Sequence, residues 1–265
     1  MTNIRRGYVD SVWGQLHYRG LGGGPRPPLV CLHATAYSGQ TFEPFMPHLA
    51  DARRVLAPDT PGYGQSDGPP ELPSFEAYAV ALAAALPPLA GAAPVDLFGF
   101  HTGAMLAVEM ALRSPAQVRR LVLVGVPYFE GVERAAWRAR LVHETQLGES
   151  FEQFRARWDY FIAQRTPGLP LARAYACFVD ELQAYPREWW AHAALFDYPA
   201  AERLARLRQP VLVINPNSAL APASRRAAAL LPNAKVIECA ELSGAVFDLG
   251  AEVLAQAMRP FLDAP

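Results

Sequence analysis

The chain has 265 residues, 51% of them hydrophobic and 18% charged, which is enough to bury the core of one large α/β domain. Its 24 basic and 25 acidic residues leave a formal net charge of -1, so no overall field favours nucleic acid or anionic lipid as a partner. No apolar stretch reaches the roughly 20 residues that span a bilayer, and the N-terminus lacks the apolar region of a secretory signal. We therefore expect a cytoplasmic protein that binds neither nucleic acid nor membranes.

The first half of the chain alternates between strand and helix patterns. Residues 6–20 predict two short strands joined at Trp13-Gly14-Gln15. Further strands are expected at 29–32, 54–59, 95–98 and 121–125, and helices after Gln40, at 74–86 and at 102–113. Ser74 is expected to cap its helix, and Pro87-Pro88 to end it. This alternation favours a parallel sheet covered by helices.

The pattern changes between 127 and 199, where the sequence is mostly helical and holds four of the five tryptophans. We interpret this stretch as a helical insertion. Strands at 211–215 and 235–239 and helices at 223–231 and 252–262 then resume the α/β pattern, with Asp248 expected to cap the last helix.

The three cysteines, Cys31, Cys177 and Cys239, stand far apart, and none has a partner at the spacing of a metal site. The chain also lacks a glycine-rich phosphate-binding loop. We expect no disulfide, no metal ion and no cofactor.

Three motifs stand in one order along the chain: Leu32-His33-Ala34-Thr35, the stretch 57–67 with Pro61-Gly62-Tyr63-Gly64, and Leu97-Phe98-Gly99-Phe100-His101-Thr102-Gly103. Together they resemble the α/β-hydrolase fold. The resemblance implies a mostly parallel central sheet with helices on both faces. It also implies a core domain of residues 1–126 and 200–265, with a helical cap at 127–199 and a pocket between the two.

The third motif corresponds to the family's nucleophile elbow, in which glycines flank a residue held in a strained turn between a strand and a helix. Gly99 and Gly103 match the flanking glycines, but the nucleophile position holds His101 in place of Ser, Cys or Asp. The alignment places Ser218 at the position of the family's acid and Gly244 at that of its histidine. The resemblance therefore argues against an ordinary serine esterase.

The family's anion site is made of two backbone N–H groups, which correspond here to Thr35 and Thr102. Because these donors do not depend on side chains, they can stabilise an oxyanion without the triad. An imidazole at the first turn of a helix is kept neutral by the helix dipole and can act as a base. We expect His101 to be a general base acting beside a carbonyl group, or alternatively a nucleophile, in isomerisation, elimination, cyclisation or carbon–carbon cleavage.

Two other functions stay open. The chain could be a catalytically inactive protein that binds a ligand or partner on a hydrolase scaffold. It could also be a hydrolase whose triad uses a displaced serine such as Ser66 or Ser243. No carboxylate is evident in the sequence to orient the His101 ring.

The expected pocket is lined by residues near the elbow, in the cap and at the other two triad positions: Ala34, Tyr37, Phe100, Tyr128, Trp137, Trp158, Ser218 and Gly244. Their aromatic rings favour a small apolar or aromatic molecule as the substrate. We expect His33 to brace the turn after its strand, and Asp59 and Asp67 to hold turns.

Overall fold

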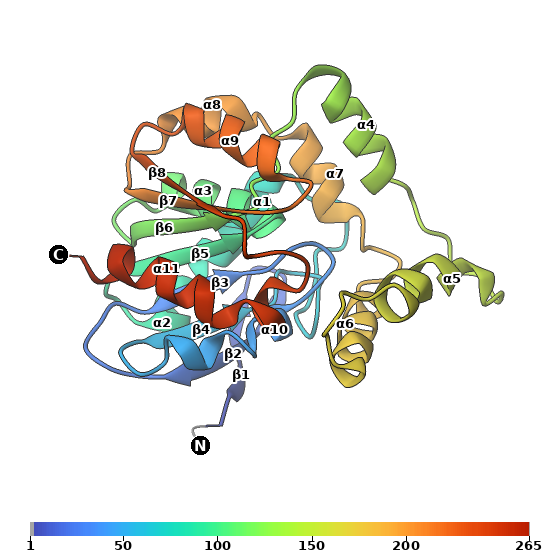
Figure 1. The fold of residues 1–265 in the computed structure, drawn as a ribbon, viewed down its shortest axis with the longest axis horizontal. Coiled ribbons are helices and arrows are strands. Elements are labelled where there is room, and N and C mark those ends of the chain that lie inside the picture. Colours follow the sequence, from blue (N-terminus) through green and yellow to red (C-terminus); the bar gives the residue numbers. More distant parts are fainter. Residues whose placement is uncertain (1–2, 265) are drawn as a thin grey trace.

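The computed structural model describes residues 3–264, apart from the side chain of Gln153, and contains one eight-stranded sheet (Figure 1). The strands are β1 (Arg5–Ser11), β2 (Gly14–Gly22), β3 (Leu29–Leu32), β4 (Arg54–Pro58), β5 (Val95–Phe100), β6 (Val118–Val124), β7 (Val211–Pro216) and β8 (Ala234–Cys239). Their order is β1-β2-β4-β3-β5-β6-β7-β8. Only the pairs β1–β2 and β2–β4 are antiparallel, so the sheet is mostly parallel as expected.

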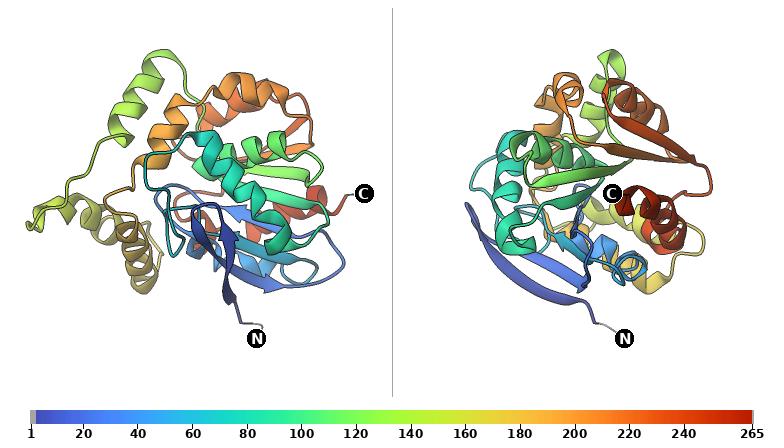
Figure 2. Two further views of the ribbon diagram at one scale, coloured as in Figure 1. Left: turned by 180° about the vertical axis from the view of Figure 1, so that it is seen from behind. Right: turned by 90° about the vertical axis from the view of Figure 1, so that its left-hand side faces the viewer.

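Helices cover both faces of the sheet (Figure 2). One face carries α1 (Phe75–Ala84), α2 (Leu86–Ala90), α3 (Thr102–Arg113), α8 (Ala200–Arg206) and α9 (Ala221–Leu230). The other carries the 3-10 turns η1 (Gly39–Phe42) and η2 (Met46–His48) and the helices α10 (Val246–Leu249) and α11 (Ala251–Asp263). Neighbouring residues of β3 enter opposite cores, Val30 that of α3 and Cys31 that of α11, because side chains alternate along a strand. Both faces of the central strands are therefore buried, which explains their uninterrupted apolar sequence.

The segment 127–199 is helical throughout its regular elements, as the sequence predicted. It contains α4 (Gly131–Leu141), α5 (Glu152–Trp158), a π-helical turn (Asp159–Ala163), α6 (Leu171–Gln183) and α7 (Trp190–Asp197). Helix α7 packs against α3 and α1, whereas α4, α5 and α6 project from the body of the molecule (Figure 1). Its status as a separate cap domain stays a prediction. None of the described helices is both long and apolar enough to cross a bilayer.

The structure departs from the local predictions at three places. The helix expected after Gln40 is reduced to the short turns η1 and η2, because Pro44 and Pro47 cannot donate the hydrogen bonds of a longer helix. The helix capped by Ser74 does end before Pro87 and Pro88, at Ala84, but a second helix, α2, was not expected after it; both prolines lie in the first turn of α2, where a missing N–H is tolerated. The last helix begins after Gly250, and Asp248 instead forms an ion pair with Arg173.

Candidate functional site

His101 occupies a sharp turn between β5 and α3, with φ 51° and ψ −117°. It is the one non-glycine residue with positive φ in the described range 3–264. The flanking glycines permit this turn: a Cβ on Gly103 would lie 2.1 Å from the Leu32 carbonyl oxygen, and one on Gly99 would lie 2.4 Å from the Ala104 Cα. The backbone conformation at His101 costs about 1–3 kcal/mol.

The His101 residue is half-buried, and its ring lies against Phe100 and Gly125. It stacks on Phe100 with 3.9 Å between ring centroids and an interplanar angle of 22°. Within the described chain the ring has no hydrogen-bond partner, so no carboxylate orients it. Burial lowers the pKa of His101 to about 4, and the imidazole is therefore neutral at pH 7.

The two expected anion donors lie at the ends of β3 and β5. Thr102 is the first residue of α3, and Thr35 is a central residue of a turn closed by the Tyr37 N–H donating to the Ala34 oxygen at 2.9 Å. Neither the Thr35 nor the Thr102 N–H has an acceptor among the described residues. Both amides thus have an unused donor within the described chain, as the expected anion site requires.

His33 fixes the near end of this turn, hereafter the anion turn (residues 34–37). Its Nε2 accepts a hydrogen bond from the Thr60 N–H at 2.8 Å, so the ring proton is on Nδ1, which donates to the Ala34 oxygen at 2.8 Å. Burial is the main cause of the lowered pKa of His33, which keeps this neutral form. The bracing role expected from the sequence matches these contacts.

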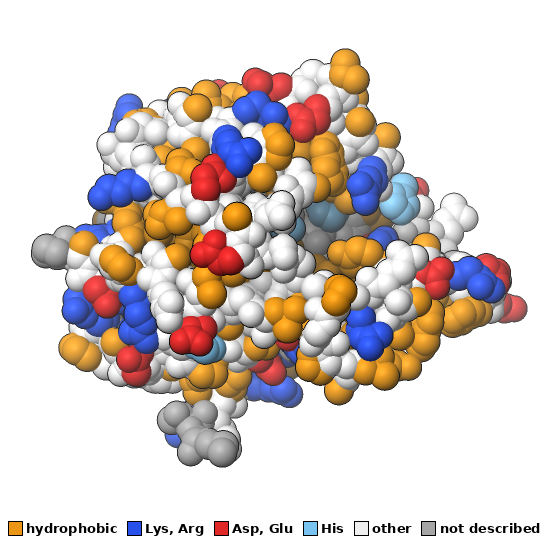
Figure 3. All heavy atoms as spheres, viewed as in Figure 1, with side chains coloured by type: hydrophobic (Ala, Val, Ile, Leu, Met, Phe, Trp, Pro, Cys, Tyr) orange, Lys and Arg blue, Asp and Glu red, His pale blue; other side chains and the backbone are white. Residues whose placement is uncertain are grey.

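A second histidine, His192 on α7, belongs to the same region. Its pKa is lowered to about 4, mainly by burial and then by the charges of His101, Arg157 and His143. The surface is hollowed between α7 and α6, and histidine side chains are visible there (Figure 3).

The predicted lining residues fall into separate groups. Tyr37 and Trp158 join one apolar cluster with Phe161 and Phe178, whereas Trp137 stacks on Phe129 in another cluster that includes Leu220. Leu220 lies near Gly125, beside the His101 ring.

The remaining lining residues lie at other places. Phe100 contacts His101, Ala34 is buried in the anion turn, and Tyr128 is buried with its hydroxyl donating to Glu130 at 2.5 Å. Because the predicted lining residues lie in separate groups, the substrate pocket between core and cap stays a prediction.

Ser218 and Gly244, which the sequence aligns with the family's acid and histidine, make only local contacts. The Ser218 Oγ accepts a hydrogen bond from the Leu220 N–H at 3.3 Å, and Gly244 has φ 62° and lies against Thr166. No serine hydroxyl in the described chain is hydrogen-bonded to a histidine ring. No group of three or more His, Cys, Asp or Glu side chains within residues 3–264 is arranged to hold a metal ion.

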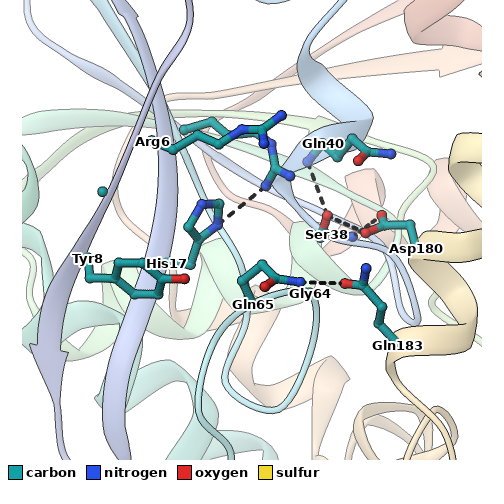
Figure 4. Close-up of a pocket in the computed structure, with 11 residues that line it drawn as sticks. Arg6, Tyr8, His17, Ser38, Gln40, Gly64, Gln65, Asp180 and Gln183 are labelled. Carbon is teal, nitrogen blue, oxygen red and sulfur yellow. Dashed lines mark hydrogen bonds between the residues drawn. The ribbon is translucent and has the colours of Figure 1, made fainter.

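A polar cavity of about 340 Å³ lies beside Ser38, the residue that follows the anion turn (Figure 4). It is lined by Arg6, Gly7, Tyr8, His17, Arg19, Ser38, Gln40, Gly64, Gln65, Asp180 and Gln183. His17 donates through Nδ1 to the buried Asp59, 2.9 Å away, and Ser38 binds Asp180 separately. No motif in the sequence predicts this cavity, because its walls come from five separate segments of the chain.

A model of the α/β-hydrolase fold family matches residues 27–238. The chain is 38% identical over 100 residues to the pimeloyl-[acyl-carrier protein] methyl ester esterase of Aromatoleum aromaticum, a match covering 38% of this chain and only 37% of that protein. It is 26% identical over 257 residues to the 2-(acetamidomethylene)succinate hydrolase of Mesorhizobium japonicum, covering 91% and 90% of the two chains. A hydrolase structure from Pseudomonas aeruginosa PA01 superposes with a TM-score of 0.81 at 22% identity, covering 98% and 99%, which shows a shared fold.

Proposed function

Because the chain belongs to the α/β-hydrolase fold family, we propose that it is a cofactor-free enzyme acting at the carbonyl group of a small apolar or aromatic molecule. His101 takes a proton from the carbon next to the carbonyl, and the Thr35 and Thr102 N–H groups bind the oxygen as it becomes negative. The names of two relatives support action at a carbonyl group, since one is an esterase of a methyl ester and the other a hydrolase of a succinate derivative.

The strained position of His101 carries the proposal. A residue that only fills space gains nothing from a backbone conformation that costs about 1–3 kcal/mol and that glycine would adopt freely. The turn instead holds an imidazole above the sheet, without a hydrogen bond to the described protein, at the start of a helix whose first N–H group, that of Thr102, has no acceptor in the described chain. That arrangement suits a group that exchanges a proton with a ligand.

The proton and electron balance of the reaction is simple. The C–H bond breaks, its proton moves to His101, and its electron pair passes to the carbonyl oxygen to form an enolate. The enolate charge stabilises the imidazolium, which burial of the ring otherwise disfavours. Return of the proton to another carbon of a conjugated enolate gives isomerisation. Elimination follows when the bond from the β-carbon to a leaving group breaks, the group departs with the electron pair, and it takes the proton from His101. If that group leaves as a stabilised carbanion, the same step breaks a carbon–carbon bond.

One observation favours the alternative of a ligand-binding protein without catalysis. The His101 ring has no carboxylate partner in the described chain, and burial lowers its pKa to about 4, which makes it a weak base. The displaced-serine hydrolase has less support, because no described serine hydroxyl contacts a histidine ring.

Exchange of α-hydrogens tests the proposal directly. Phenylacetone in D₂O, followed by ¹H NMR, should lose its α-hydrogens faster with the protein than without it. His101→Ala should abolish the acceleration while ligand binding, measured by saturation-transfer NMR, stays within about tenfold. His48→Ala, which removes a histidine from the far side of the core, is the matched control and should exchange like the native protein.

The outcomes separate the three functions. Exchange that persists in His101→Ala excludes His101 as the base. Binding of phenylacetone without exchange in the native protein supports the binding alternative. Labelling of a serine by a fluorophosphonate, together with hydrolysis of p-nitrophenyl acetate, supports the displaced hydrolase.

A further inference from the structure

Helix α6 is attached to the core through polar contacts along one face. Arg173, Asp180 and Gln183 are spaced by seven and three residues and therefore lie on one stripe of the helix. Arg173 binds Asp248 at 2.6 Å and also donates to the Gln40 carbonyl oxygen at 3.2 Å. At the other end, Gln183 accepts a hydrogen bond from the Gln65 side chain at 2.9 Å.

Asp180 is the buried member of this stripe, with 5% of its surface exposed. One carboxylate oxygen accepts the Ser38 N–H at 2.8 Å, and the other accepts the Ser38 hydroxyl at 2.6 Å (Figure 4). The carboxylate therefore takes both donors of one residue that lies 142 positions away in the sequence.

Ser38 follows directly on the anion turn that carries Thr35. His33 holds the near end of this turn through the Ala34 oxygen, and Asp180 holds the far end through Ser38. The next amide, the Gly39 N–H, is bound by the buried Asp59 at 2.8 Å. The donor of Thr35 thus lies in a short segment whose two ends are fixed by buried polar groups.

Burial of the Asp180 carboxylate disfavours its negative charge. Burial is the main cause that raises the pKa of Asp180 to about 6; the Asp59 charge raises it further, while the bonds from Ser38 and the charge of Arg19 lower it. The other charged or titratable groups around the same cavity or near Asp180 are Arg6, Tyr8, His17, Tyr37, Cys177 and Glu181. Burying a charged carboxylate costs more free energy than burying a neutral side chain. The two hydrogen bonds from Ser38 offset part of that cost, which indicates that the contact itself has a role.

We propose that Asp180 is a positioning residue that fixes the Thr35 N–H in its anion-binding orientation by holding Ser38. This inference rests on the proposed function, because it assigns the anion turn a role in catalysis. It also makes the orientation of the anion turn depend on the docking of α6.

Kinetics on phenylacetone exchange give the first test. Asp180→Asn and Ser38→Ala should each lower kcat at least tenfold with KM within about threefold, because a displaced donor weakens binding of the developing oxyanion. The double variant should be no slower than the slower single variant, since both changes break one connection. Gln183→Ala, which removes a contact of the same stripe away from Ser38, should keep the native kcat.

The pH dependence of kcat distinguishes a positioning role of Asp180 from a general loss of stability. The kcat of the native protein should fall as the pH is lowered through about 6, because a protonated Asp180 accepts one bond fewer. In Asp180→Asn this step should be absent between pH 5 and 7. An unchanged kcat in Asp180→Asn, or an equal loss in Gln183→Ala, would overturn the proposal.

Amide hydrogen exchange read by mass spectrometry tests the same connection without any substrate. Peptides covering residues 33–41 should exchange at least tenfold faster in Asp180→Asn than in the native protein, and at the native rate in Gln183→Ala. Equal exchange in all three proteins refutes the positioning role. This readout decides the role of Asp180 even if His101→Ala shows the proposed reaction to be wrong.

Discussion

The ring of His101 lies directly above Gly125, the residue that follows β6. A Cβ built on Gly125 would come 2.5 Å from the His101 Cδ2 and 2.8 Å from its Nε2. Both distances are below van der Waals contact, so the missing side chain of Gly125 provides the space that the imidazole occupies. A glycine that is remote in sequence thus sets the position of the proposed base.

Gly125→Ala should therefore displace the imidazole and lower kcat for phenylacetone exchange by about 100-fold, since a shift of about 1 Å in a reacting group can cost that much. Gly131→Ala is the matched control, because Gly131 also has positive φ, 51° against 64° at Gly125, but a Cβ there would meet nothing within 4 Å. Both variants carry similar backbone strain, so equal activity in the two proteins would contradict the role assigned to Gly125.

The pH dependence of catalysis should show a weakly basic imidazole. Burial lowers the pKa of His101 to about 4, so kcat/KM, which reports the free enzyme, should rise with pH through about 4 and then level off. The profile is best measured in Asp180→Asn, where the expected step near pH 6 is removed. A single limb near pH 6.5, the value of an unperturbed histidine, would show that the ring is solvated and not buried.

His33 should matter for stability through the acceptor it offers to a buried amide. His33→Ala leaves the Thr60 N–H without a partner, which should lower the free energy of unfolding by about 2–3 kcal/mol in urea titrations. His33→Gln can place its side-chain oxygen near the former Nε2 and should lose about 1 kcal/mol or less. Equal losses in the two variants would mean that packing, and not this hydrogen bond, determines the effect.

Glu109 should be a stability residue without a role in catalysis. Its buried carboxylate on α3 binds Arg203 through two bonds at 2.7 and 2.8 Å, and it also binds Arg113 and the Tyr198 hydroxyl. Glu109→Ala should lower the free energy of unfolding by about 3–5 kcal/mol, because it leaves the buried Tyr198 hydroxyl and the mostly buried Arg203 guanidinium without their acceptor. Glu202→Ala, which breaks an exposed pair with Arg206, should change it by less than about 0.5 kcal/mol. Activity per folded molecule should be native in both variants.

The sequence determined the central framework of the protein. Strand β3 was predicted at its observed bounds, and α3 from Thr102 to Arg113, because an apolar run and a glycine-flanked turn are local signals. The resemblance of this motif to the family's elbow predicted a strained turn at position 101. The structure has such a turn there, because glycine permits the close backbone approaches at Gly99 and Gly103.

The tertiary structure alone decided which groups meet. Periodicity showed that 171–183 is helical, but it could not show that Asp180 would bind Ser38 across 142 residues, or that Gly125 would lie beneath His101. It also could not show that the described part of the chain would leave the His101 ring without a partner. Such contacts depend on how helices and strands pack against one another, and the packing of a pair of elements is fixed by the whole core and not by the local sequence of either one.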